Sequence, residues 1–141
     1  PLPHQAIEWL KELKIKATGS DYVFPSRRKS SRPYISDDTL NAALANLFGK
    51  TARKTGSTTG DVLTPAGVEH FVVHDLRRTG RTLMSYLKIY PHIAEKCLNH
   101  NRGGKQKIYD RWEYFDERKE AHQMLANLIA PLVDIKSSDS A

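Results

Sequence analysis

The fold class rests on one stretch of sequence, HDLRRTGRTLMSYL at residues 74–87. Its apolar residues recur at helical spacing, which predicts an amphipathic helix with a buried stripe made of Leu76, Leu83, Met84 and Leu87. The helix begins near His74, directly after the short apolar run at residues 71–73. A helix, rather than a strand, therefore stands near the centre of the chain.

Segments on both sides of this stretch also predict helices, at residues 4–16, about 39–48, 91–98 and about 116–132. The second of these begins at Ser36-Asp37-Asp38-Thr39, where hydroxyl and carboxylate groups can cap free backbone N–H groups. Gly49 ends it. Its apolar face consists of Leu40, Ala43, Leu44 and Leu47, and that of the last helix of Met124, Leu125, Leu128 and Ile129. The expected fold is mainly α with little strand.

Between these helices the sequence predicts loops. Residues 22–25 form a short extended piece that ends at a proline, and a basic loop follows it. Residues 50–65 are polar and rich in Gly, Thr and Lys, and residues 101–105 contain adjacent glycines, which are costly inside a helix. Residues 136–141 are expected to be a flexible tail.

Composition narrows the class of protein. The chain has 141 residues, enough for about one domain, with a formal net charge of +6. A basic chain favours polyanionic partners such as nucleic acid. No apolar run reaches the ~18 residues that a membrane helix needs. The single cysteine, Cys97, excludes an internal disulfide and a cysteine-rich zinc site, and it fits a reducing cytoplasm.

Four residues are candidates for catalysis at a phosphate group: His74, Arg77, His100 and Tyr109. His74 and Arg77 are three residues apart at a helix start, so both can face the same way. Together the four offer an oxygen nucleophile, a permanent cation and two imidazoles. A tyrosine hydroxyl is a poor nucleophile at neutral pH, so a neighbouring imidazole or cation must assist it. Arginine suits the non-bridging oxygens of a phosphate, because its planar fork donates two hydrogen bonds.

Three short motifs resemble the catalytic signature of the tyrosine recombinases, the phage-type integrases: HDLRRT at residues 74–79, CLNH at 97–100 and IYDR at 108–111. The intervals from Arg77 to His100 and from His100 to Tyr109 are 23 and 9 residues, and both fit that family. The flanking segments YVFPSRR at 22–28 and TLNAAL at 39–44 are close to segments of prophage and genomic-island integrases. The resemblance runs from Pro1 to about Leu132.

The resemblance implies a helical tyrosine-recombinase catalytic core and a role for each candidate. Tyr109 would attack the scissile phosphate and form a 3′-phosphotyrosyl link, and Arg77 would hold the non-bridging oxygens. His74 would assist proton transfer, and His100 would hydrogen-bond the phosphate. Rejoining would need no ATP, metal or other cofactor. The implied partners are double-stranded DNA at attachment sites and a tetramer of the full-length protein on that DNA, in the cytoplasm and nucleoid of a bacterium.

The chain departs from the family at one end. The family also uses an earlier arginine and a lysine in a following β-hairpin, and no residue here can be assigned to either role. Because Pro1-Leu2-Pro3 and the next helix resemble the segment just after that hairpin, both residues are expected upstream, as is an N-terminal DNA-binding domain. Residues 1–135 are thus expected to be a partial catalytic domain that is at best feebly active alone.

Basic residues near these motifs are candidate phosphate contacts, because phosphate contacts supply most protein–DNA hydrogen bonds. They are Arg27, Arg28, Lys29, Arg32, Arg78, Arg102, Lys105, Lys107 and Arg111.

Two other functions compete with the recombinase. One is a non-catalytic helical DNA-binding module, with residues 79–98 as a helix-turn-helix-like piece. The other is a metal-dependent phosphodiesterase that uses His70, His74 and His100, although no HExxH motif or carboxylate cluster accompanies them. Tyr114 is the nearest rival nucleophile, five residues beyond Tyr109.

Overall fold

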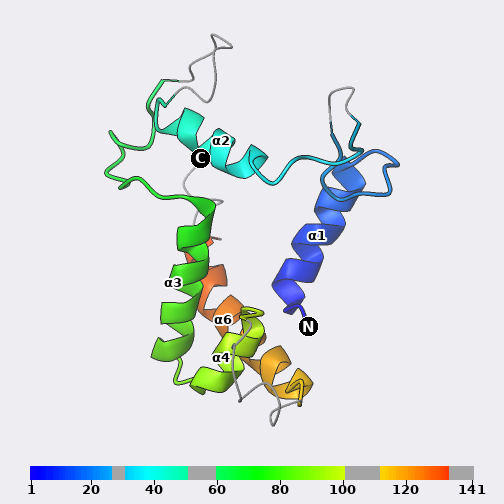
Figure 1. Cartoon of the computed structure of the whole chain (residues 1–141), viewed down its shortest axis with the longest axis vertical. Helices are drawn as coiled ribbons and strands as arrows, with labels where there is room; N and C mark the ends of the chain where they lie inside the picture. The colour runs from blue at the N-terminus through cyan, green and yellow to red at the C-terminus, as the bar shows by residue number, and fades with distance from the viewer. Residues whose placement is uncertain (27–30, 51–59, 101–111, 134–141) are drawn as a thin grey trace, which may run out of the picture. The chain divides into compact units, whose positions relative to one another are not determined.

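A computed structural model describes residues 1–26, 31–50, 60–100 and 112–133. Within these ranges the chain forms five helices (Figure 1): α1 (His4–Lys16), α2 (Thr39–Leu47), α3 (Val73–Tyr86), α4 (Pro91–Cys97) and α6 (Phe115–Val133). The extended pairing found in the same ranges is a single antiparallel bridge between Pro25 and Tyr34. The expectation of a mainly helical fold is confirmed. No helix in the described part is both long and apolar enough to cross a membrane.

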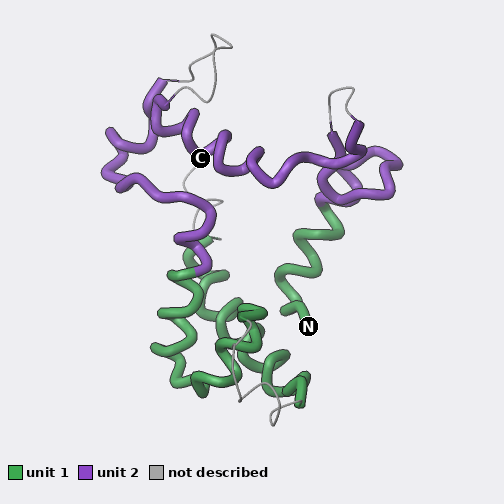
Figure 2. The backbone as a smooth tube through the Cα atoms, in the orientation of Figure 1, with its two compact units in different colours: residues 1–12, 78–141 green, residues 13–77 purple. Residues whose placement is uncertain are grey.

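The chain divides into two compact units (Figure 2). Unit 1 contains residues 1–12 and 78–141, and unit 2 contains residues 13–77. The division falls inside two helices, since α1 passes from unit 1 to unit 2 after Glu12 and α3 passes back after Arg77.

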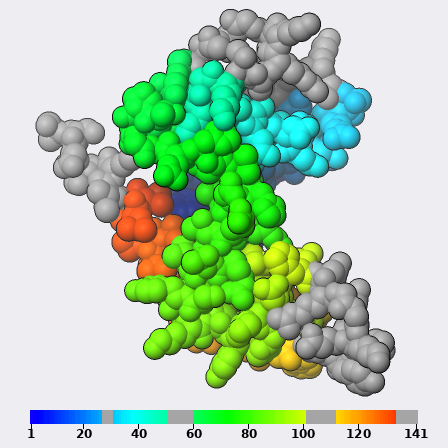
Figure 3. All heavy atoms as spheres, turned by 60° about the vertical axis from the view of Figure 1, so that its left-hand side comes forward, coloured from blue at the N-terminus to red at the C-terminus, as the bar shows by residue number. Residues whose placement is uncertain are grey.

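Unit 1 is built on the packing of α4 against α6. Its buried residues are Met84 from α3, Ile93 and Ala94 from α4, and Ala121 from α6. In the space-filling view α3 and α4 form one continuous surface, green to yellow-green, in this unit (Figure 3). The small side chains of Ala94 and Ala121 let α4 and α6 approach closely. The seven-residue helix α4 can therefore contribute two of the buried core residues.

The first turns of α1 join unit 1 through polar contacts with α6. The backbone N–H of His4 donates to Gln123 Oε1 (3.0 Å), and Gln5 Nε2 donates to Asn127 Oδ1 (2.9 Å). His122 Nδ1 lies 2.8 Å from the carbonyl oxygen of Pro1. These amide and imidazole bonds link residues more than 115 positions apart in sequence and close the unit.

Unit 2 has a smaller core around Phe48, which is buried at the end of α2. Its ring packs against His70 (4.9 Å between centroids) and meets Phe71 edge to face (5.8 Å). At the other end of the unit, backbone bonds from Ser26 to Pro33 and from Ile35 to Phe24 pair the two ends of the predicted basic loop.

Three helices end in the same way, with a residue of positive φ that lets the chain turn back on the last carbonyls. The residues are Gly49 (φ 66°) after α2, Lys88 (φ 59°) after α3 and Asn99 (φ 52°) after α4. In each case the next N–H bonds to a carbonyl five residues earlier: Lys50 to Ala45, Ile89 to Met84 and His100 to Glu95. The predicted helix stop at Gly49 is confirmed.

Several expected details are wrong. Leu76 is 57% exposed, because it lies on the first turn of α3 in unit 2, whereas Leu83, Met84 and Leu87 lie on the turns that belong to unit 1. Leu40 on α2 (52%) and Met124 on α6 (38%) are also exposed. Leu40 is exposed because, within the described ranges, α4 and α6 are the only helix pair in extensive contact, and Met124 is exposed because it lines a cavity. Asp38 makes no side-chain cap bond, since its own backbone is already helical.

The predicted loop over 50–65 falls partly on residues 51–59, the loop over 101–105 falls wholly within residues 101–111, and the predicted tail over 136–141 falls within residues 134–141. These residues lie outside the described part of the chain.

Candidate functional site

His74 and Arg77 lie on the first turns of α3, three residues apart. His74 is exposed and Arg77 is half-buried. The turn that carries them is held by a reciprocal pair of bonds: the Val72 N–H donates to Asp75 Oδ2 (3.0 Å), and the Asp75 N–H donates to the Val72 carbonyl (2.9 Å). The carboxylate thus satisfies a backbone donor at the helix start, where negative charge also offsets the helix dipole.

Asn41 on α2 fixes the start of α3 from outside the helix. Its Oδ1 accepts from the backbone N–H of Val73 at 3.0 Å, across 32 residues of sequence. The first residue of α3, and with it the helix phase of His74 and Arg77, is therefore tied to α2. Sequence reasoning missed this contact, because Asn41 carries no signal beyond its place in the TLNAAL segment.

His100 follows α4 and belongs to unit 1. Asn99 takes the left-handed conformation, its N–H donates to the Lys96 carbonyl (3.1 Å), and the N–H of His100 donates to the Glu95 carbonyl (3.0 Å). This pair of bonds is the Schellman pattern of a helix C-terminus. Asparagine tolerates positive φ better than other residues with a Cβ. The backbone of His100 is thereby placed one helical turn from Glu95.

The side chain of Glu95 is shared between two partners. Its Oε1 accepts from Arg81 Nε at 2.9 Å, and its Oε2 lies 2.7 Å from His100 Nδ1. Arg81 also donates from Nη1 to Ser85 Oγ one turn along α3 (2.6 Å). The Arg81 guanidinium, followed by the His100 ring, holds the pKa of the Glu95 carboxyl below its ordinary value. Neither Arg81 nor Glu95 is among the candidate residues found from the sequence.

Tyr109 lies outside the described residues, as do seven of the nine candidate DNA contacts: Arg27, Arg28, Lys29, Arg102, Lys105, Lys107 and Arg111. The other two are described. Arg32 is exposed beside the Pro25–Tyr34 bridge in unit 2, and Arg78 is exposed on α3 in unit 1.

The rival nucleophile Tyr114 has a packing role. Its ring meets His92 of α4 at 5.1 Å between centroids, and Lys96 Nζ lies 6.0 Å from its ring centre. Lys96 also donates to the carbonyl of Trp112 at 3.0 Å. Residues 112–114 are thus fastened to α4, and Tyr114 serves as one of the anchoring side chains.

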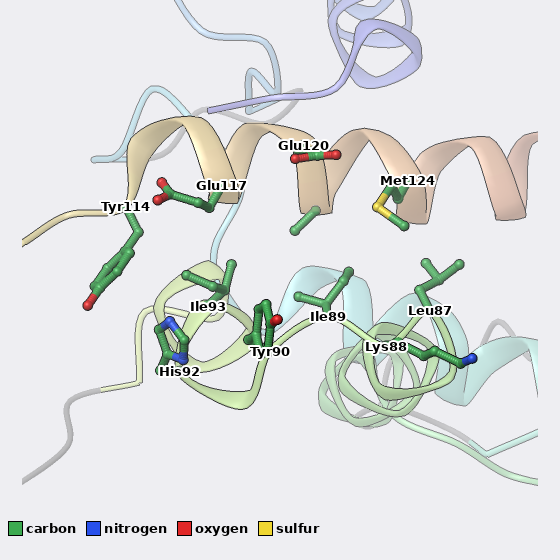
Figure 4. A pocket seen from close by; sticks show the side chains of 11 residues that line it. Leu87, Lys88, Ile89, Tyr90, His92, Ile93, Tyr114, Glu117, Glu120 and Met124 are labelled. Atoms are coloured by element: carbon green, nitrogen blue, oxygen red, sulfur yellow. The ribbon is translucent and has the colours of Figure 1, made fainter.

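Tyr114 also lines a cavity of about 380 Å³ in unit 1 (Figure 4). The cavity lies between α6 and the segment that joins α3 to α4. Leu87 and Ile89 from that segment and Ile93 from α4 point toward Met124 and Glu120 on α6, and Tyr114 and His92 stand at one end. The side chains assigned to phosphate chemistry, His74, Arg77 and His100, are not among its lining residues.

Neither metal nor thiol chemistry finds support in the described ranges. No group of three or more His, Cys, Asp and Glu residues there could hold a metal ion. His70 packs against Phe48. Burial raises the pKa of the Cys97 thiol above its ordinary value, which disfavours the reactive thiolate.

Comparison with known proteins shows what kind of protein this chain resembles. Over 130 residues the chain is 28% identical to the prophage integrase IntA of Escherichia coli strain K12. The matched region covers 92% of this chain and 27% of IntA, so the chain spans about a quarter of the length of that relative. No family model matches the chain, and no solved structure matches it. The chain is thus similar to part of a prophage integrase, in line with the resemblance of its motifs.

Proposed function

We propose that this chain is part of the catalytic domain of a site-specific DNA recombinase that cleaves and rejoins strands through a tyrosine. The observation that carries the proposal is the ordered set His74, Arg77, His100 and Tyr109 at the spacing of the tyrosine recombinases, in a chain similar to a prophage integrase over nearly its whole length. The net charge of +6 suits a DNA substrate.

In the proposed reaction, the Tyr109 hydroxyl attacks the scissile phosphorus. The bond from phosphorus to the tyrosine oxygen forms, the bond to the 5′-oxygen breaks, and that oxygen leaves with a proton as a 5′-hydroxyl. Arg77 donates to the non-bridging oxygens, on which negative charge gathers. His74 assists proton transfer and His100 hydrogen-bonds the phosphate. The covalent link conserves the phosphodiester energy, so a second strand can displace the tyrosine without ATP.

The protonation of the leaving 5′-oxygen is assigned to a lysine outside this chain, together with a second phosphate-binding arginine. Full activity is therefore proposed for a longer protein that carries both, acting as a tetramer on two DNA duplexes.

Covalent trapping tests the proposal. A protein that carries this chain with its upstream region is incubated with DNA from its attachment region, nicked beside the cleavage point so that religation fails. We expect a detergent-resistant protein–DNA adduct from the wild type and none from Tyr109→Phe. Tyr114→Phe is the matched control, because it removes the nearest other hydroxyl, and it should still form the adduct.

An adduct that persists in Tyr109→Phe but disappears in Tyr114→Phe would move the nucleophile to Tyr114. DNA binding without any adduct from the wild type would favour the non-catalytic DNA-binding module. Hydrolysis that a chelator abolishes would favour the metal-dependent phosphodiesterase.

A further inference from the structure

Glu95 contacts His100 at two points. The carbonyl oxygen of Glu95 accepts the backbone N–H of His100 (3.0 Å), and its carboxylate Oε2 lies 2.7 Å from Nδ1 of the ring. One contact sets where the chain places His100, and the other sets how the ring is turned. A single residue on α4 thus controls both the position and the orientation of the imidazole.

Arg81 holds Glu95 in turn. The Nε of Arg81 donates to Glu95 Oε1 at 2.9 Å, and both side chains are largely sheltered, at 29% and 23% exposure. Partial burial with good geometry makes this pair stronger than an ordinary surface ion pair. Two basic side chains of α4 and α6 pair with a different carboxylate, since Lys96 Nζ lies 3.8 Å and Arg118 Nη1 3.3 Å from Glu113.

The arrangement determines which ring nitrogen carries hydrogen. A carboxylate that accepts from a guanidinium has no proton to give, so the hydrogen between Oε2 and Nδ1 belongs to the imidazole. Free neutral histidine favours the other tautomer, with hydrogen on Nε2. The contact with Glu95 therefore selects the less common tautomer of the neutral ring, in which Nε2 is an acceptor. Nε2 donates a hydrogen bond only when the ring carries a second hydrogen.

We propose that Glu95 is a positioning residue that accepts the Nδ1 hydrogen of His100 and so fixes the ring orientation, with Nε2 turned toward the scissile phosphate. The ring that contacts both groups is the imidazolium, which donates from Nδ1 to Glu95 and from Nε2 to a phosphate oxygen. The relay runs from Arg81 on α3 through Glu95 on α4 to His100. It rests on the proposed function, in which His100 contacts the phosphate. Carboxylates that orient a histidine in metal sites act in the same way.

The test uses Glu95→Gln, which changes hydrogen bonding with little change in size. An amide has one acceptor oxygen where the carboxylate has two. Because Arg81 has only donors, its hydrogen bond must go to that oxygen. The amide NH₂ group then faces Nδ1 of His100. Nδ1 can accept a hydrogen bond from this group only if Nδ1 itself carries no hydrogen. We therefore expect the substitution to move His100 to the Nε2–H tautomer.

Ring ¹⁵N spectra of the labelled 141-residue chain at alkaline pH read out the tautomer directly, since protonated and unprotonated ring nitrogens resonate far apart. The His100 signals are those missing in His100→Gln. Wild type should show hydrogen on Nδ1, and Glu95→Gln should show it on Nε2. Glu8→Gln is the matched control, because it removes a carboxylate from the exposed α1 ion pair with Lys11, and it should resemble the wild type.

The rate of adduct formation at saturating DNA provides the second readout. We expect Glu95→Gln to slow it about 10- to 100-fold, the usual effect of removing a carboxylate that orients a histidine, because the imidazolium loses the negative charge that holds it in place. DNA affinity should stay unchanged. Arg81→Gln should slow it less, because Glu95 can still reach His100. Glu8→Gln should react at the wild-type rate.

An unchanged His100 tautomer in Glu95→Gln overturns the proposal, as does an unchanged rate in Glu95→Gln when His100→Gln is slow. If His100→Gln itself reacts normally while Tyr109→Phe does not, the recombinase function stands and this inference falls. If Tyr109→Phe still forms the adduct, the proposed function fails instead, and the spectra alone decide whether Glu95 holds His100.

Discussion

At the scale of single residues, Arg77 is the side chain whose chemistry is hardest to replace in the proposed reaction. Its guanidinium offers two parallel donors and stays charged throughout, whereas lysine offers a single compact charge. It also lies on a helix start that is held by Asp75 and by Asn41. Its contribution should therefore appear in the rate of cleavage rather than in the affinity for DNA.

We predict that Arg77→Ala slows adduct formation by about 10²- to 10³-fold, the typical effect of losing one preorganised donor to a transition state, with a small effect on DNA affinity. Single-turnover rates at saturating DNA, beside filter-binding affinities, measure the two quantities. Arg78→Ala is the neighbouring control and should affect binding more than rate. Equal losses of rate and affinity in Arg77→Ala would make Arg77 a DNA-positioning residue.

The predictability of the candidate site also differs residue by residue. His74, Arg77, His100 and Tyr109 are found from motif and spacing because their side-chain chemistry is uncommon in that order. Asn41 and Glu95 are not found in this way. The role of Asn41 depends on Val73, 32 residues away. The role of Glu95 depends on Arg81, 14 residues away, and on the turn at Asn99 that places the backbone of His100.

At the scale of elements, the turns at the helix ends set the direction in which the chain leaves each helix. The turn after α3 places Lys88 at φ 59°, a conformation that costs residues with a Cβ about 1–2 kcal/mol relative to the right-handed region. The turn is needed, because the Ile89 N–H bonds to the Met84 carbonyl there and directs the chain into α4. The structure therefore carries local strain at Lys88.

We predict that Lys88→Gly raises the free energy of unfolding by about 1 kcal/mol, because glycine adopts positive φ without a Cβ clash. Urea unfolding followed by circular dichroism measures it. Gly49→Ala is the converse control, because Gly49 has φ 66° and an added Cβ would lie 3.0 Å from the Cβ of Asp61. It should destabilise by a similar amount or more. A less stable Lys88→Gly variant would contradict the strain argument.

The helix boundaries could be predicted where local sequence decides them. The bounds of α1, His4–Lys16, match the predicted range, and α4 begins at Pro91 as expected, since proline suits the first helical position. The buried faces could not be predicted as well. Leu76 and Leu40 have the spacing of core residues but are exposed, because a stripe is buried only where another element lies against it.

At the scale of the whole molecule, the positive charge is the property most relevant to the proposed function. An excess of six positive charges attracts DNA through its phosphates, whatever the base sequence. Attachment-site specificity needs contacts with base edges or a response to DNA shape. Binding of this chain to arbitrary duplex DNA should therefore be weak and governed by salt.

We predict that log K for binding a non-specific duplex falls linearly with log salt concentration, with a slope of about −0.9 for each phosphate neutralised. Fluorescence anisotropy across a salt series measures the slope. Arg32→Gln should reduce its magnitude by about 1 if Arg32 contacts a phosphate. Glu8→Gln should leave it almost unchanged. A flat salt response would remove the argument that the basic residues bind DNA.

The amino-acid sequence by itself determined the helical class, the approximate extent of each helix and the order of the candidate catalytic residues, because periodicity, end signals and side-chain chemistry are local properties. The tertiary structure decided which apolar stripes are buried, that α2 fixes the start of α3 through Asn41, and that Glu95 joins Arg81 to His100. These features depend on contacts between residues that lie far apart in the sequence. A hydrogen bond across 14 or 32 residues exists only once the chain has folded around it.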